Sequence, residues 1–177
     1  MKIIRSKAAI LCLLAISAVS TTHANESIVY VGIGSAKSNS SSGGTSDKNP
    51  FSLGYINISE VRNTIWGLDF SKEGTLLDST YGQNKAVSQG MSFNLLLGPN
   101  LGRTEFGRFD VAVLIGARQK TTDCPSSYLG YQCYADAAPN TSYAFNYGAV
   151  LTWSFKSVMV GIRATGASTQ ALVGFSF

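Results

Sequence analysis

The chain has 177 residues, with 14 basic and 10 acidic side chains and a single histidine. Residues 1–24 have the three parts of a secretory signal: basic residues at the start, an apolar run over 8–19, and Thr22-His23-Ala24 before residue 25. If they are removed, three basic residues and the histidine leave with them, and the balance becomes 11 − 10 = +1. This charge and the lack of a basic run exclude nucleic acid as an expected partner. The apolar run is also shorter than the about 20 residues that a spanning helix needs.

Residues 25–177 are rich in Gly, Ser, Asn, Thr and aromatic residues and show no sustained helical periodicity, which predicts an all-β domain. Apolar residues alternate with small or polar ones in eight segments. In chain order, the predicted strands cover 27–36, a segment from 51 that ends in a turn around 59–61, 62–71, 88–97, 109–118, 143–155, 157–165 and 168–177.

The connections between these strands alternate in length, except that a brief turn over 166–168 follows the seventh strand. Polar connections over 37–49, 72–87 and 119–141 follow the first, third and fifth strands, and Thr75-Leu76-Leu77 could extend the third strand. The connections after the second, fourth and sixth strands are shorter, and 98–107 is the longest of these. An even strand number with alternating short and long connections is typical of bacterial outer-membrane barrels, whose long loops face the cell exterior. The predicted fold is therefore an eight-stranded antiparallel up-and-down transmembrane β-barrel.

The long connection over 119–141 contains Cys124 and Cys133. Two cysteines in an exported chain most simply form one disulfide that closes a small loop in an oxidising compartment. A zinc site is the less favoured alternative, because residues 25–177 offer no histidine and no further cysteine as ligands. We expect no metal site and no cofactor.

A soluble lipid-carrying barrel also has eight antiparallel strands, so the two faces of each strand must decide between the alternatives. One face is apolar and almost free of charge, whereas the other contains small residues together with Asp69, Asp110, Arg118 and Arg163. A carrier would need long charged side chains on its outer face to stay soluble. Small residues suit the crowded lumen of an eight-stranded barrel. The two aspartates are the expected acceptors for the two arginines, in pairs that the sequence leaves open, and we favour a structural role over an ion path.

Aromatic residues fall near the strand ends, as expected for girdles at two membrane interfaces. The expected outer girdle contains Phe51, Phe70 and Tyr143, and the periplasmic one contains Phe109, Trp153, Phe155, Phe175 and Phe177. With these features and its final Val173-x-Phe175-x-Phe177, the chain resembles the small eight-stranded outer-membrane barrels, namely the transmembrane domain of the outer membrane protein A family and the OmpX and Ail type proteins. The resemblance implies that the terminal aromatic signature is recognised by the barrel assembly machinery, with Phe177 in that role.

The resemblance also implies a non-enzymatic surface protein of the Gram-negative outer membrane that contributes to envelope integrity, adhesion or host interaction. Its partners would be outer-membrane lipids and lipopolysaccharide, the assembly machinery and a host or surface ligand. An enzyme is disfavoured because hydroxyl nucleophiles ordinarily need a histidine base, and residues 25–177 contain none. A carboxylate dyad of Asp78 with Asp69 is conceivable, but nothing in the sequence places the two together.

A lipid- or lipopolysaccharide-binding function, or a lipid-modifying activity without a histidine base, is the alternative. Basic residues lie in or beside the outward connections, where outer-leaflet phosphates would meet them: Lys37, Lys48, Lys72, Lys85, Arg118 and Lys120. Ordinary solvated loop charge is the favoured explanation of these residues. A porin is the least favoured function, because an eight-stranded lumen is too narrow.

Overall fold

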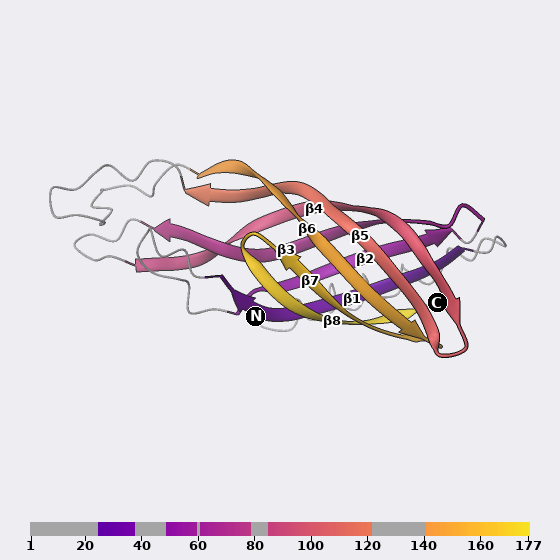
Figure 1. Cartoon of the computed structure of the whole chain (residues 1–177). Coiled ribbons are helices and arrows are strands. Elements are labelled where there is room, and N and C mark those ends of the chain that lie inside the picture. Colours follow the sequence, from indigo (N-terminus) through magenta and orange to yellow (C-terminus); the bar gives the residue numbers. More distant parts are fainter. Residues whose placement is uncertain (1–24, 38–48, 60, 79–84, 122–140) are drawn as a thin grey trace, which may run out of the picture.

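The computed structural model describes residues 25–37, 49–59, 61–78, 85–121 and 141–177. Within these ranges the chain forms eight strands and no helix: β1 Asn25–Ala36, β2 Phe51–Ser59, β3 Thr64–Asp78, β4 Lys85–Thr104, β5 Gly107–Thr121, β6 Thr141–Phe155, β7 Val158–Thr165 and β8 Ser168–Ser176. Each strand pairs antiparallel with the next, and β8 pairs with β1, which closes the barrel (Figure 1). The predicted all-β fold with eight antiparallel strands in up-and-down order is confirmed.

Side chains alternate between the lumen and the outer surface along each strand, because the side-chain period of a strand is two residues. On β2 the outward residues from Phe51 onward alternate with buried ones, and on β8 the buried positions are Ser168, Gln170, Leu172 and Ser176. The outward positions contain large apolar residues on all eight strands. The inward row thus contains both polar and apolar residues, whereas the outward row exposes large apolar side chains, which are mostly buried in water-soluble proteins.

Two predicted connections are shorter than expected. Residues 72–78 continue β3, an extension that the sequence had left open at Thr75-Leu76-Leu77, and residues 98–104 continue β4. Register shifts occur between Glu73 and Leu76 and again between Asn100 and Gly102. A bulge adds a residue to one strand and breaks the two-residue alternation. Periodicity alone therefore places the strand ends too early at both positions.

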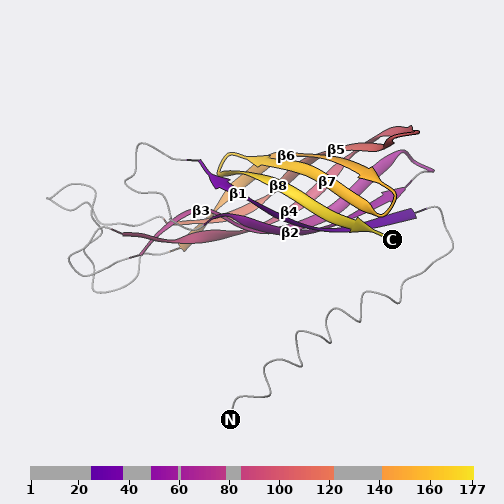
Figure 2. The same ribbon diagram turned by 90° about the horizontal axis from the view of Figure 1, so that it is seen from below.

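The start of β1 and the end of β8 lie at one end of the barrel, which we call the terminal end (Figure 2). Backbone hydrogen bonds join Ser27 and Phe177 in both directions there, at 3.0 and 2.9 Å. Short turns connect β2 to β3, β4 to β5 and β6 to β7 at the same end. The turn before β5 ends at Gly107, whose φ of 128° is open to glycine but strained for other residues.

The opposite end, which we call the loop end, is uneven. The β7–β8 hairpin has strands of only 8 and 9 residues, whereas β4 has 20. Figure 1 shows β3, β4, β5 and β6 projecting beyond this hairpin at the loop end. The barrel thus has one tall wall and one short wall, and the charged residues described next lie where the short wall ends.

Candidate functional site in the barrel lumen

One row of inward-facing positions runs across the wall from β1 to β6, and its side chains form part of the polar network of the lumen. The strand register aligns Tyr30, Gly54, Asp69, Asn94, Gly116 and Asn146. A side chain at Gly54 would collide with the ring of Tyr30, so this glycine lets Tyr30 lie across β2 and donate to Asp69 Oδ2 at 2.8 Å. Gly116 has the same effect further along, where Asn146 Nδ2 donates to Asn94 Oδ1 at 2.9 Å.

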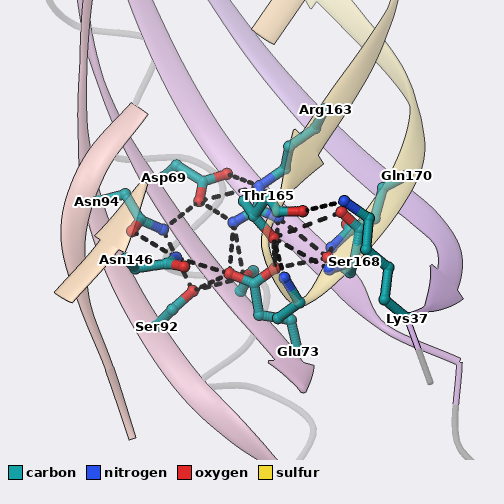
Figure 3. Close-up of polar contacts among 12 residues, drawn as sticks. Lys37, Asp69, Glu73, Ser92, Asn94, Asn146, Arg163, Thr165, Ser168 and Gln170 are labelled. Atoms are coloured by element: carbon teal, nitrogen blue, oxygen red, sulfur yellow. Dashed lines mark hydrogen bonds and ion pairs between the residues drawn. The ribbon is translucent and has the colours of Figure 1, made fainter. Parts of the chain in front are cut away.

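Arg163 of β7 reaches across the lumen to β3. Its guanidinium donates to Asp69 Oδ1 at 2.9 Å and to Glu73 Oε2 at 2.8 Å, and all three side chains are 0% exposed (Figure 3). In the closed strand order, β3 and β7 are separated by three strands on either side, β4 to β6 one way and β8 to β2 the other. The ion pairs therefore connect diametrically opposite walls.

Glu73 is the most heavily hydrogen-bonded acceptor of this network. Besides Arg163, it accepts hydrogen bonds from Ser168 Oγ at 2.5 Å, Thr165 Oγ1 at 2.7 Å, Asn146 Nδ2 at 2.8 Å and Ser92 Oγ at 3.0 Å. Figure 3 shows these donors converging on the carboxylate from several strands. Since a buried charge is costly unless it is paired and hydrogen-bonded, this number of donors explains how the lumen accommodates it.

A second charged cluster lies at the terminal end. Arg108 of β5 is 1% exposed and contacts Glu26 of β1 and, through Nε at 3.0 Å, Asp110 Oδ2. β1 and β5 are also separated by three strands on either side, so this contact joins a second pair of opposite walls. Its partnering is less complete: Glu26 is 20% exposed, and Asp110 Oδ1 and the neighbouring hydroxyls of Thr152 and Ser154 are buried without a hydrogen-bond partner.

An apolar layer belongs to the same lumen. Its members are fully or almost fully buried: Ile28, Ile56, Ile58, Ile65, Leu96, Ala112, Leu114, Val150, Met159 and Leu172, in one cluster with Tyr30. The lumen is therefore packed with side chains in its described part, with charged residues bridging opposite walls at two levels. This arrangement can hold the barrel closed.

The structure brings together only part of the predicted charge network. Asp69 and Arg163 form an ion pair, whereas Asp110 pairs with Arg108, a residue that the prediction did not include. Arg118 and Asp110 are eight residues apart on the extended strand β5, about 26 Å at the rise of a strand, so a pair between them is ruled out. The guanidinium of Arg118 instead lies beside Gly74 near the loop end. Asp69 and Asp78 are similarly separated along β3.

The sequence reasoning missed Glu73, Arg108 and Glu26. Glu73 was assigned to a loop, although Asp69, Ser71 and Glu73 recur at intervals of two and so continue one face of a strand. The same signal was available in Arg108 and Asp110 on β5. Glu26 lay one residue before the predicted start of the first strand, and no pattern in the sequence indicated its partner on β5.

The residues of the predicted assembly signal and aromatic girdles lie on the outward face. Val173, Phe175 and Phe177 are more than half exposed and point away from the lumen. Phe51, Phe70 and Tyr143 lie outward toward the loop end, and Phe109, Trp153, Phe155, Phe175 and Phe177 lie outward toward the terminal end. Trp153 stacks with Phe109 and Phe155 at centroid distances of 6.4 and 6.2 Å. Cys124 and Cys133, and the predicted signal over 1–24, lie outside the described residues.

The described residues contain no cluster of three or more His, Cys, Asp or Glu side chains that could hold a metal ion. In the same part of the chain there is no helix long and apolar enough to cross a membrane. In comparisons with known proteins, no family model matches the chain, and no curated protein matches it.

Proposed function

We propose that the chain is an integral protein of the bacterial outer membrane, similar to the OmpX, Ail and outer membrane protein A barrels. The observation that carries this proposal is the closed barrel with apolar side chains outward and ion pairs inside. A soluble monomer rarely exposes an apolar patch of more than a few hundred Å². A closed barrel satisfies its backbone hydrogen bonds within the sheet, which is the requirement for strands in lipid.

The proposed role is non-enzymatic. The chain would present its long connections at the cell surface and contribute to envelope integrity, adhesion or host interaction, with the terminal end in the periplasm. The tall wall of β3 to β6 supports this role, because its strands extend beyond the β7–β8 hairpin at the loop end. Among the described residues, Ser168 and Glu73 bring a hydroxyl and a carboxylate closest together, and both are 0% exposed, so a substrate would not reach them.

Cell fractionation tests the membrane part of the proposal. We expect the protein in the outer-membrane fraction, extractable only with detergent, and migrating faster on gels before heating than after. A protein that remains in solution without detergent would contradict the proposal.

The role of the loops is tested by replacing residues 122–140 with a short Gly-Ser linker. Adhesion or resistance to host serum should fall while heat-modifiable migration stays the same, and unchanged adhesion and serum resistance would count against this loop as the functional surface.

A second candidate function is lipopolysaccharide binding at the outer rim, and the position of Lys72 favours it. Lys72 is exposed on the outward face of β3, in register with Phe51 and Met91 at the loop-end edge of the apolar surface. A cation at this height would meet phosphate groups of the outer leaflet. Lys72→Gln should weaken retention of lipopolysaccharide in native mass spectra, and Lys156→Gln at the terminal end is the matched control.

A lipid-modifying activity is tested by comparing lipid A mass profiles from cells with and without the protein. We expect the two profiles to be the same.

The C-terminal residues have a proposed role in assembly. Phe177→Ala retains the backbone hydrogen bonds with Ser27 and removes only the outward ring. We expect it to slow assembly into the outer membrane more than it lowers the unfolding free energy of the finished barrel. Equal losses in both would contradict recognition of this ring by the assembly machinery.

A further inference from the structure

The apolar surface of the barrel differs greatly in length from one face to another. On β1, β2 and β3 the outward apolar runs are Val29 to Ile33, Phe51 to Tyr55 and Trp66 to Phe70, each about 13 Å along the strand at about 3.3 Å per residue. On β5 the run from Phe109 to Ala117 covers about 26 Å, and on β6 the run from Tyr143 to Phe155 covers about 40 Å.

Polar residues end the short runs on both sides. Toward the terminal end the next outward residues are Ser27, Asn57 and Thr64, and toward the loop end β1 and β3 continue with Ser35 and Lys72. A strand tilted by about 40° converts 13 Å along the strand into about 10 Å of height, whereas the apolar band of outer-membrane barrels is about 25 Å tall. A flat bilayer around the whole barrel would therefore cover polar side chains on this face, which we call the short-belt face (β1, β2 and β3).

The polar residues at the terminal end of the short-belt face are hydrogen-bonded to one another. Ser27 Oγ and Tyr55 Oη lie 2.9 Å apart, and Asn57 Nδ2 lies 3.3 Å from Ser27 Oγ. Tyr55 also packs edge-on against Trp66, with ring centroids 6.0 Å apart. Tyr and Trp side chains with one apolar and one polar end favour the boundary between hydrocarbon and headgroups. On this face the boundary would thus lie at Tyr55 and Trp66.

We propose that the short-belt face thins the bilayer locally, so that inner-leaflet phospholipid headgroups contact the Ser27–Tyr55–Asn57 cluster. This inference rests on the proposed membrane location. Lipid suits the face better than a second copy of the chain, because a symmetric contact through it would bring two Lys72 side chains to the same height. The polar cluster already satisfies part of its own hydrogen bonding, and headgroups or water supply the rest.

Depth-dependent fluorescence quenching tests this proposal directly. The described residues contain two tryptophans, Trp66 on the short-belt face and Trp153 on β6, so Trp153→Phe and Trp66→Phe each leave one of them. The vesicles contain phosphatidylcholine whose acyl chains are brominated either near the ester end (shallow bromine) or near their middle (deep bromine). We expect shallow bromine to quench Trp66 at least as strongly as it quenches Trp153. Stronger quenching of Trp66 by deep bromine than by shallow bromine would overturn the thinning. Quenching of Trp153 with none of Trp66 would indicate a protein partner on this face and would also overturn it.

A lengthened belt provides the second test. The triple variant Ser27→Val, Asn57→Leu and Thr64→Val adds one apolar position to each of the three strands. We expect the wild-type preference for folding into dilauroyl over dioleoyl phosphatidylcholine vesicles to fall by about fivefold in this variant, because mismatch costs fractions of a kcal/mol per Å. Thr169→Val on β8 is the control and should leave the preference unchanged. Equal preferences in the wild type and the triple variant would contradict the proposal, whereas failure of every variant to enter vesicles would contradict the membrane location itself.

Discussion

The two charged clusters of the lumen both join opposite walls, but they differ in how completely they are partnered. Around Arg163, both carboxylates are 0% exposed and every charged side chain has several hydrogen bonds. Around Arg108, Glu26 is partly exposed and Asp110 Oδ1 has no partner. Water can therefore reach Glu26 at the terminal end, whereas it reaches neither of the carboxylates that pair with Arg163. The same type of ion pair should consequently contribute very different amounts to stability at the two levels.

The largest effect is expected for Arg163→Met, which leaves Asp69 and Glu73 buried without a cation. Removing one partner of a buried ion pair typically costs about 3–5 kcal/mol. The measurement is the unfolding free energy in urea, with the barrel refolded in detergent micelles or vesicles. A loss below about 1 kcal/mol, the range of an exposed surface pair, would contradict the account of the lumen.

Arg108→Met is the matched change at the terminal end. We expect a smaller loss, of about 2 kcal/mol: Asp110 is left buried, but Glu26 can be hydrated and keeps its contact with Arg103 at 3.4 Å. The same urea titration measures it. A loss equal to or larger than that of Arg163→Met would remove the distinction between the two clusters.

The two clusters can also be compared by removing a single threonine hydroxyl from each. Thr165 Oγ1 donates to Glu73 at 2.7 Å, whereas Thr152 Oγ1 is buried beside Asp110 without a partner. Thr165→Val should cost about 2 kcal/mol, and Thr152→Val should change stability by less than about 0.5 kcal/mol, since an isosteric apolar group replaces an unpaired hydroxyl. Similar losses for both variants would show that the Thr152 hydroxyl has a partner.

The smallest expected effect is that of salt. Screening weakens interactions between exposed charges much more than those between buried ones. In about 1 M NaCl the part of the Arg108→Met penalty that comes from the partly exposed Glu26 should therefore shrink, and the penalty of Arg163→Met should stay the same within error. Urea titrations of both variants at low and high salt provide the measurement, and an equal reduction in both penalties would place the two clusters in similar solvent environments.

Much of the fold was predictable from the sequence because alternation with period two is a local property. The strand that ends at Phe155 and the one that starts at Ser168 were placed within one or two residues of their observed bounds. The alternation fails at bulges, so the extension of β3 that contains Glu73 was assigned to a loop. Which arginine meets which carboxylate depends on the registers of several strands together. Asp69 with Arg163 was one of the open choices, whereas Glu26 with Arg108 was not foreseen.

The central claim is that the outward row of each strand faces lipid and the inward row faces a packed lumen. Leu95 and Leu96 of β4 test it side by side, because Leu95 is 40% exposed and Leu96 is 0% exposed. Spin labels would be attached to single cysteines at positions 91–98, with Cys124 and Cys133 replaced by serine and the protein reconstituted in vesicles. We predict that accessibility to oxygen alternates with period two and is high at the outward positions, while a water-soluble nickel reagent reaches none of them. High accessibility to the nickel reagent at the outward positions would contradict a membrane-embedded barrel.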